Sequence, residues 1–187
     1  MEPLERLAEL IRAKNSSDNE IADVIGRPTE RGHVGEYIAA SIFGIKLEQS
    51  AAHKGIDGRF IQEKLAGMTV NIKWYGKREG LLDINPSLLP DFYLVMTGPK
   101  SGAISSRGTT RPWLISSVFL FDAHELVRML KACGIKIGIA TSVRGQMWED
   151  AEIYPVQRNN KLVLASDQKR QLALFGPNQH ELKNPRR

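Results

Sequence analysis

The sequence predicts an α/β fold in which helices flank a central sheet, with a small helical extension at the N-terminus and a basic tail at the C-terminus. Thr69–Tyr75 alternates apolar and polar residues with the period of two that is typical of a half-buried strand. Phe92–Met96 is apolar throughout, as expected of a strand buried on both faces. Asp122 and Glu125 form a capping box, which predicts a helix between two apolar segments.

The N-terminal quarter of the chain has helical patterning. Apolar residues at a spacing of three and four predict a helix over residues 3–14. Ser16-Ser17-Asp18 offers capping residues, so we expect a second, short helix over residues 21–25 that ends at Gly26. A third helix is expected from about residue 30 to residue 43, with Gly44 at its end.

Strand-like segments fill the rest of the chain, separated by polar loops. The predicted loops are residues 76–91 and the acid-free, basic segment 98–112. The helix that begins at Asp122 runs to Gly134, and the strand after it suggests a right-handed crossover. The predicted strands are residues 45–50, a short one at Asp57, 69–75, 92–96, 113–121, 135–140, 151–155 and 162–165.

Length and composition indicate one ordinary globular domain. The chain has 187 residues, of which 42% are apolar and 25% charged, enough to build a single core. We expect residues 1–165 to form that domain, with residues 1–29 as the helical extension and residues 166–187 as the tail. The N-terminus has no apolar signal region and the longest apolar runs are far shorter than a membrane span, so a cytoplasmic protein without membrane contact is expected.

The formal net charge of +5 is unevenly distributed. Residues 158–187 contain seven basic and two acidic residues, and residues 44–115 contain ten basic and six acidic residues. Residues 1–30 contain seven acidic and four basic residues. Positive charge in the middle of the chain and on the tail suits an anionic partner such as nucleic acid, although many basic surfaces only favour solubility.

The residues with the clearest chemical pattern lie between Glu36 and Lys73. Asp57 stands between two glycines at a predicted strand, and alternation places Asn71, Lys73 and Tyr75 on one face of the next strand. Glu36 is the one acid inside the preceding helix, at the border of its apolar stripe. If the two strands are neighbours, an acid and a lysine share one site.

This order of residues resembles the PD-(D/E)XK nuclease superfamily, in which a helix that often carries Glu precedes an Asp on one strand and (Asp/Glu)-x-Lys on the next. The resemblance covers about residues 30–140, where it implies a restriction-endonuclease-like core with a mixed central sheet. It also implies a DNA endonuclease that uses Mg²⁺ or Mn²⁺. Asp57 and Glu36 would then hold the metal, with Lys73 beside the attacking water.

Asn71 departs from that pattern, because the family has Asp or Glu at this position. An amide oxygen can bind a hard cation but brings no charge, so metal affinity falls. Two outcomes stay open: Glu36 supplies the missing carboxylate in an active nuclease, or the fold survives as a catalytically degraded DNA-binding or adaptor protein. A third interpretation is purely structural, with Asp57 as a turn residue and Lys73 as a solvated strand residue.

A basic rim around this site would suit the phosphate backbone of DNA, the expected partner, whose repair, replication or restriction the enzyme would then serve. Whether the protein forms a homodimer stays open. The cations of this rim are Lys54, Arg59, Lys77, Arg78, Lys100, Arg107 and Arg111.

The tail carries a second motif, the pentapeptide Gln171-Leu172-Ala173-Leu174-Phe175. It resembles the Gln-Leu-x-Leu-Phe peptide with which bacterial replication and repair proteins bind the replicative sliding clamp. That resemblance implies an extended peptide in which Leu172, Leu174 and Phe175 fill apolar pockets. The alternative is an amphipathic helix that begins at about residue 166 and packs Leu172 and Phe175 on the body.

Overall fold

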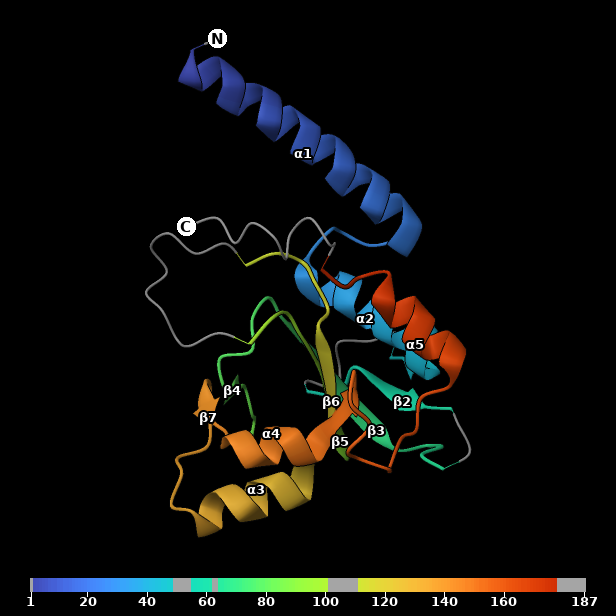
Figure 1. Ribbon diagram of the computed structural model, residues 1–187, viewed down its shortest axis with the longest axis vertical. Helices are drawn as coiled ribbons and strands as arrows, with labels where there is room; N and C mark the ends of the chain where they lie inside the picture. Colours follow the sequence, from blue (N-terminus) through green and yellow to red (C-terminus); the bar gives the residue numbers. More distant parts are fainter. Residues whose placement is uncertain (1, 49–54, 62–63, 101–110, 178–187) are drawn as a thin grey trace.

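The structure is a computed structural model that describes residues 2–48, 55–61, 64–100 and 111–177. Five helices and eight strands follow one another along these residues (Figure 1). The helices are α1 (Pro3–Ile25), α2 (Arg31–Phe43), α3 (Ala123–Ala132), α4 (Gly145–Ala151) and α5 (Ser166–Ala173). The strands are β1 (Ile45–Leu47), β2 (Gly58–Phe60), β3 (Thr69–Tyr75), β4 (Leu81–Leu82), β5 (Phe92–Thr97), β6 (Ser117–Asp122), β7 (Thr141–Ser142) and β8 (Glu152–Tyr154).

The central sheet has six strands in the order β1-β2-β3-β5-β6-β8. The first three strands form an antiparallel meander, β5 runs parallel to β3, and β6 and β8 return antiparallel. Helices α2 and α5 lie against one face of this sheet and α3 and α4 against the other (Figure 1). The fold is therefore α/β with a mixed central sheet between helices, in agreement with the predicted class.

Strand alternation sorts the core into two apolar layers. Val70, Ile72 and Trp74 of β3 lie in the layer beneath α2 and α5. On the neighbouring strand, Tyr93 and Val95 lie in the layer beneath α3 and α4. Strand β5 is buried along its whole length, which is why its sequence is a continuous apolar run and does not alternate.

Helix α2 brings the predicted acid close to the sheet because one of its residues lacks a side chain. A Cβ atom on Gly35 would lie 3.1 Å from the Cβ of Trp74, so glycine allows the helix to approach β3 closely. The helix ends at Gly44, whose φ of 61° is the left-handed conformation that glycine adopts without strain. Glu36 follows Gly35 and therefore lies at the border between the helix and the sheet.

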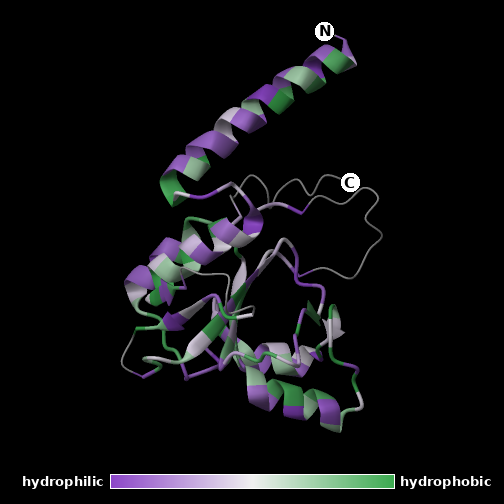
Figure 2. Ribbon diagram, turned by 180° about the vertical axis from the view of Figure 1, so that it is seen from behind, coloured by the Kyte–Doolittle hydropathy of each residue, from purple (hydrophilic) through white to green (hydrophobic). Residues whose placement is uncertain are grey.

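Helix α1 is one continuous helix and not the predicted pair of short helices. The prediction failed because the polar residues in its middle find partners along the helix. The hydroxyl of Ser17 donates to the carbonyl of Ala13 at 3.2 Å, and Lys14 forms an ion pair with Asp18 one turn further on. None of the residues of α1 is buried, and the helix extends away from the rest of the protein (Figures 1 and 2).

Two predicted strands are also absent from the described residues. Residues 135–140 are irregular, although Ile135 and Ile137 pack against the α3 and α4 layer. Residues 162–165 are irregular as well, because the side chain of Gln157 binds their backbone. Its Nε2 donates to the carbonyl of Leu162 at 3.0 Å and its Oε1 accepts from the amide of Leu164 at 3.2 Å.

The helix that begins at Asp122 does not lead into a parallel crossover. Asp122 caps this helix, with its carboxylate accepting from the Glu125 amide at 3.0 Å, which is one of the two hydrogen bonds of the predicted capping box. After α3 the chain forms β7, which pairs with β4 in a separate two-stranded sheet, and then α4 and β8. Strand β8 is antiparallel to β6. The parallel pair is β3 with β5, joined by the segment 76–91 that contains β4.

No helix in the part of the chain that the structure describes is long and apolar enough to span a bilayer.

Candidate active site

Asp57 lies where β2 separates from β3. The register pairs Gly58 with Val70, and the Asp57 amide donates to the Val70 carbonyl at 2.9 Å. Further along β3 the side chain of Asp57 replaces the backbone as hydrogen-bond partner: its Oδ2 accepts from the backbone N–H of Ile72 at 2.6 Å. Strand N–H groups point along the plane of the sheet. The carboxylate therefore lies at the edge of β3, between the two faces.

The surroundings of Asp57 oppose its negative charge. Burial raises the pKa of the Asp57 carboxyl, and the negative charge of Glu36 raises it further. The hydrogen bond from Ile72 and the positive charges of Lys73 and Arg27 act in the opposite direction, but the pKa remains above its ordinary value. A half-buried carboxyl with a second acid and a lysine in electrostatic reach is typical of functional sites.

Glu36 approaches from the α2 side and already has a partner. Its Oε2 accepts from Nη1 of Arg27 at 2.5 Å, and 22% of its side chain is exposed. Arg27 follows Gly26, the last residue of the turn that closes α1. No sequence pattern indicates this residue, since an arginine between two helices has no distinctive spacing. Arg27 holds Glu36 in place and adds a positive charge beside Asp57.

Asn71 and Lys73 point to the face opposite α2, as the alternation of β3 predicts. Lys73 is half-buried and has no ion-pair partner among the described residues. Asn71 is 5% exposed, and its Oδ1 atom has no hydrogen-bond partner within the described part of the chain. Continuing the β2–β3 register places Asn71 directly opposite Asp57. Glu36 and Lys73 thus each lie within electrostatic reach of Asp57, with a buried amide oxygen on the adjoining strand.

These residues provide oxygen ligands for a hard cation, but fewer charges than a typical site. Among the residues that the structure describes, no group of three or more His, Cys, Asp and Glu side chains could hold a metal ion. The donors at this site are two carboxylates, from Glu36 and Asp57, and the amide of Asn71. An amide oxygen buried without a donor is a ligand that Mg²⁺ accepts, so the chemistry of the set fits that ion.

The predicted basic rim is only partly available to an anion. Arg59 forms an ion pair with Glu48 at 3.2 Å. Arg111 binds Glu79 through two hydrogen bonds of 2.9 Å. Lys54 and Arg107 lie outside the described residues, as does most of the predicted loop 98–112.

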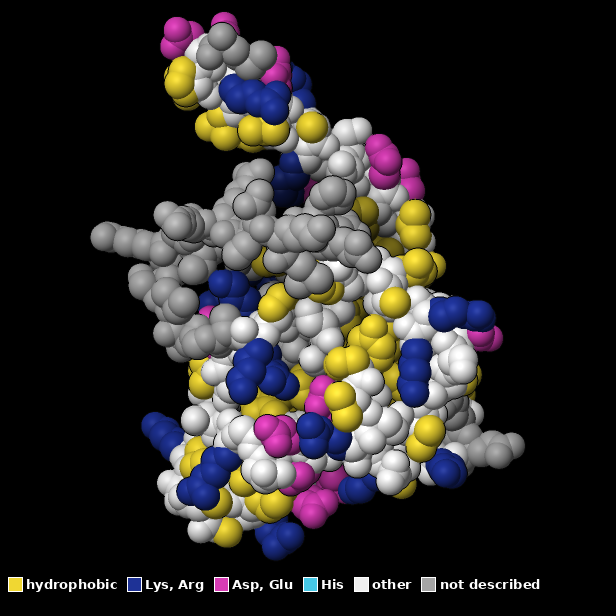
Figure 3. All heavy atoms as spheres, in the orientation of Figure 1, with side chains coloured by type: hydrophobic (Ala, Val, Ile, Leu, Met, Phe, Trp, Pro, Cys, Tyr) yellow, Lys and Arg dark blue, Asp and Glu magenta, His cyan; other side chains and the backbone are white. Residues whose placement is uncertain are grey.

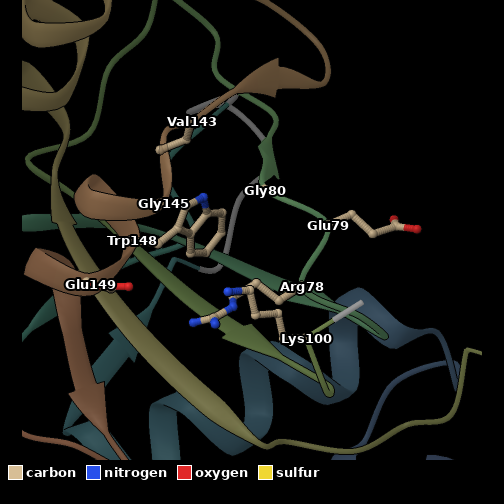
Figure 4. Close-up of a pocket in the computed structure, with 8 residues that line it drawn as sticks. All are labelled: Arg78, Glu79, Gly80, Lys100, Val143, Gly145, Trp148 and Glu149. Atoms are coloured by element: carbon tan, nitrogen blue, oxygen red, sulfur yellow. The ribbon is translucent and has the colours of Figure 1, made fainter. Parts of the chain in front are cut away.

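Arg78 and Lys100 are the rim residues that lie together. They form a parallel backbone bridge just past the ends of β3 and β5. Both line a hollow of about 410 Å³ in which their side chains extend in the same direction, whereas Glu79 turns the other way (Figure 4). The guanidinium of Arg78 lies 5.4 Å from the ring centre of Phe119, on the same face of the sheet as Lys73. This pair extends the positive charge of Lys73 along one face.

The tail motif comprises the last residues of α5 and the turn that follows the helix, and it is folded against the body. Leu172 is fully buried, Phe175 packs against the core, and the Phe175 carbonyl accepts from the Ile115 amide at 2.8 Å. Leu174 is 79% exposed. The side chain of Gln168 fixes α5 to the end of α2 through a 2.6 Å hydrogen bond to the carbonyl of Ile42. The packing alternative is therefore the conformation observed, and docking on a clamp would require this helix turn to detach from the body.

Comparison of the chain with protein-family models and with curated proteins finds no match.

Proposed function

We propose that this protein is a metal-dependent DNA nuclease of the restriction-endonuclease-like type. The observation that supports the proposal best is the half-buried Asp57 carboxyl at the edge of β3, with Glu36 and Lys73 both within electrostatic reach of it. Neither a turn residue nor a solvated strand lysine needs a second acid held in place by an arginine. A phosphodiester-cleaving site does need clustered carboxylates and a lysine.

The arrangement of elements supports the same proposal. An acid-bearing helix, α2, comes first and is followed by the antiparallel meander β1-β2-β3, with Asp57 at β2 and Lys73 on β3. Strand β5 then lies parallel to β3. This is the order of helix, acid strand and lysine strand that the PD-(D/E)XK resemblance implies. A two-stranded unit, β4 with β7, stands beside this core.

Asp57, Glu36 and the Oδ1 of Asn71 would hold Mg²⁺, which when bound neutralises charge on the phosphate and lowers the pKa of a bound water. Asp57 must be ionised for this role, and its raised pKa means that the site is poorly satisfied without a cation. Glu36 must share its carboxylate with Arg27 or release it. Lys73 positions the attacking water through its ammonium group and stabilises negative charge that develops on the phosphate.

The cations on the Lys73 face would bind the phosphates that flank the scissile bond. From Ile72 to Arg78 an extended chain covers roughly 20 Å at about 3.3 Å per residue, which is about six steps of one DNA strand. Lys73, Arg78 and Lys100 lie along this path, and none of them has an ion-pair partner among the described residues. We therefore expect DNA binding that weakens steeply as salt concentration rises.

The test is cleavage of plasmid DNA with Mg²⁺ or Mn²⁺ by the wild type, Asp57→Asn and Lys73→Met. The amide oxygen introduced by Asp57→Asn can still accept from the Ile72 amide, and Met keeps the aliphatic stem of the lysine, so both variants should fold. We expect each to lose at least about 100-fold in rate, the usual size for a lost acid–base or metal-binding group.

The matched control is Asp91→Asn. Asp91 also accepts hydrogen bonds from a β3 residue, Thr69, at 2.7 Å, but Thr69 is the first residue of the strand, away from Ile72. This variant should cleave like the wild type. Cleavage that is equal in all four proteins, or absent from all four, would contradict the nuclease proposal.

A non-catalytic DNA-binding protein is the second candidate. The observations that favour it are the neutral Asn71 in the lysine motif and the ion pair that already occupies Glu36. It predicts salt-sensitive DNA binding that is unchanged in Asp57→Asn and lost when Arg78 and Lys100 are both replaced by Ala. Fluorescence anisotropy with a labelled duplex distinguishes the two, because the nuclease proposal also requires a Mg²⁺-dependent change that Asp57→Asn abolishes.

A further inference from the structure

Helix α1 carries an apolar stripe that nothing in the described structure covers. Leu4 is 78% exposed, and Leu7, Leu10 and Ile11 are about half exposed. In Figure 3 yellow side chains follow this helix along one side. Isolated apolar residues on a surface need no explanation, but a contiguous row of large ones usually marks an interface.

The C-terminal half of the same helix forms one wall of an apolar groove. Ile21 and Val24 lie on that wall, and the opposite walls include Tyr37 of α2, Trp113 and Leu174. The groove has a volume of about 790 Å³. Val24 is 68% exposed and Leu174 79% exposed, so the lining is incompletely covered. One straight helix of 23 residues cannot fold its own N-terminal stripe back into this groove.

We propose that a second copy of the chain fills the groove, with the two α1 helices packed antiparallel about a two-fold axis. With the axis at the level of Ser16, Leu7 faces the partner's Ile25. Ile11 then faces the partner's Ile21. At 3.6 residues per turn, Leu7, Ile11, Ile21 and Ile25 all fall within about 40° of one line along the helix, so a single face makes both contacts. Each copy places its N-terminal stripe on the partner's groove, as an isologous interface requires.

The charges on this face agree with the same register. Lys14 and Asp18 interrupt the apolar stripe on the same line of α1 and form an exposed ion pair within one chain. In the antiparallel arrangement Lys14 of one copy lies opposite the partner's Asp18, and the reverse holds by symmetry. A parallel arrangement would place like charges opposite each other, which costs energy and selects against that orientation.

The size of the contact explains why the groove is needed as well as the stripe. A helix of 23 residues is about 34 Å long and its contact face about 10 Å wide, which gives roughly 340 Å² per chain. Stable dimers bury about 800 Å² per partner. The remaining area has to come from the groove walls, including Tyr37, Trp113 and Leu174, against the partner's N-terminal turns.

The first test is the molar mass of the full chain by light scattering over a range of concentrations. The wild type should be a dimer, and Leu7→Glu combined with Ile11→Glu should be a monomer of the same helix content. Ser16→Glu adds a charge on the opposite side of α1 and should remain dimeric. A wild type that stays monomeric at every concentration, or a dimer that Leu7→Glu with Ile11→Glu leaves intact, would overturn the proposal and leave the groove to a different occupant.

Charge exchange tests the antiparallel register. Lys14→Glu leaves acids at both central positions, and Asp18→Lys leaves bases at both. Each variant alone should dimerise at least about tenfold more weakly than the wild type, whereas an equimolar mixture should recover dimers, because acids of one copy then face bases of the other. An ion pair that acted only within one chain would be lost in both variants and not recovered on mixing, a result that would refute this register.

Discussion

Two residues of β3, Thr69 at its start and Ile72 at its middle, each have a backbone N–H that donates to an aspartate from another segment, but the two aspartates differ in their other contacts. At the N-terminal end, Asp91 accepts from the amide and the hydroxyl of Thr69, both at 2.7 Å, and the Asp91 amide donates back to that hydroxyl at 2.8 Å. At the middle of the strand, Asp57 accepts one bond, from Ile72.

The Asp91 end is a closed ring of hydrogen bonds, which is what a residue with a structural role requires. The surroundings of Asp57 are incomplete: its half-buried carboxyl has a second acid in electrostatic reach and accepts one hydrogen bond, from the backbone of Ile72. Such an arrangement lowers stability and is retained where a ligand completes it. A hydrogen bond to the strand edge therefore does not by itself distinguish a structural aspartate from a binding one.

Asn71→Asp should produce the largest difference in stability between the surroundings of Asp57 and those of Asp91, since it adds negative charge beside Asp57 alone. A third acid at a position that is 5% exposed should destabilise the metal-free protein by about 3 kcal/mol, the usual cost of an unpaired buried charge. Mg²⁺ should remove most of that loss and bind at least about tenfold more tightly than to the wild type. Urea unfolding with and without Mg²⁺ measures both effects.

The matched protein for this prediction is the double variant Asp57→Asn with Asn71→Asp. It has the same number of acids as the wild type, so its metal-free stability should lie closer to that of the wild type. If Asn71→Asp alone unfolds no more easily than the wild type, position 71 does not share an electrostatic environment with Asp57.

Asp91→Ala should be the next largest change, and it acts on stability alone. It leaves the Thr69 amide without its acceptor and removes the hydroxyl bond, which together should cost about 2 kcal/mol. Under the nuclease proposal, activity per folded molecule should be unchanged. Thermal unfolding followed by circular dichroism gives the stability, and a parallel loss of activity at a temperature where the variant is fully folded would contradict the structural role of Asp91.

The positions of the two aspartates were only partly foreseeable from the sequence. Alternation and apolar runs correctly predicted β3 and most of β5, because a strand that is buried on one or both faces leaves a direct imprint on hydropathy. The ring at Asp91 has no such imprint: it depends on Asp91 and Thr69, which are distant in sequence and meet only because β3 and β5 are parallel.

The residues of the candidate site were likewise only partly predictable from the sequence. Glu36, Asp57, Asn71 and Lys73 could be selected from their order along the chain, and the fold places Glu36 and Lys73 within electrostatic reach of Asp57. Arg27 could not be selected, since its role depends on how the turn after α1 approaches α2. The long α1 was missed for a related reason: local capping signals at residues 16–18 were outweighed by bonds along the helix, which a sequence pattern does not reveal.

Asp57→Asn should give the smallest change, and of the opposite sign to Asp91→Ala. Removing the charge eliminates the cost of burial and the repulsion from Glu36 while an acceptor for Ile72 remains. We expect the metal-free variant to be more stable than the wild type at neutral pH by about 1 kcal/mol, a common gain when a functional site is relieved. Urea unfolding in EDTA measures it, and Asp91→Asn under the same conditions should show no gain.

The pH dependence of that gain follows from the direction of the Asp57 pKa shift. Because the pKa of folded Asp57 lies above its ordinary value of 3.8, folded wild type keeps a proton over a pH range in which the unfolded chain has lost it. Wild-type stability therefore falls, relative to Asp57→Asn, as pH rises through that range. The advantage of the variant should be full at neutral pH and should vanish as pH approaches 3.8. A stability gain that is equal at acidic and neutral pH would mean that Asp57→Asn acts through repacking and not by removing the charge of Asp57.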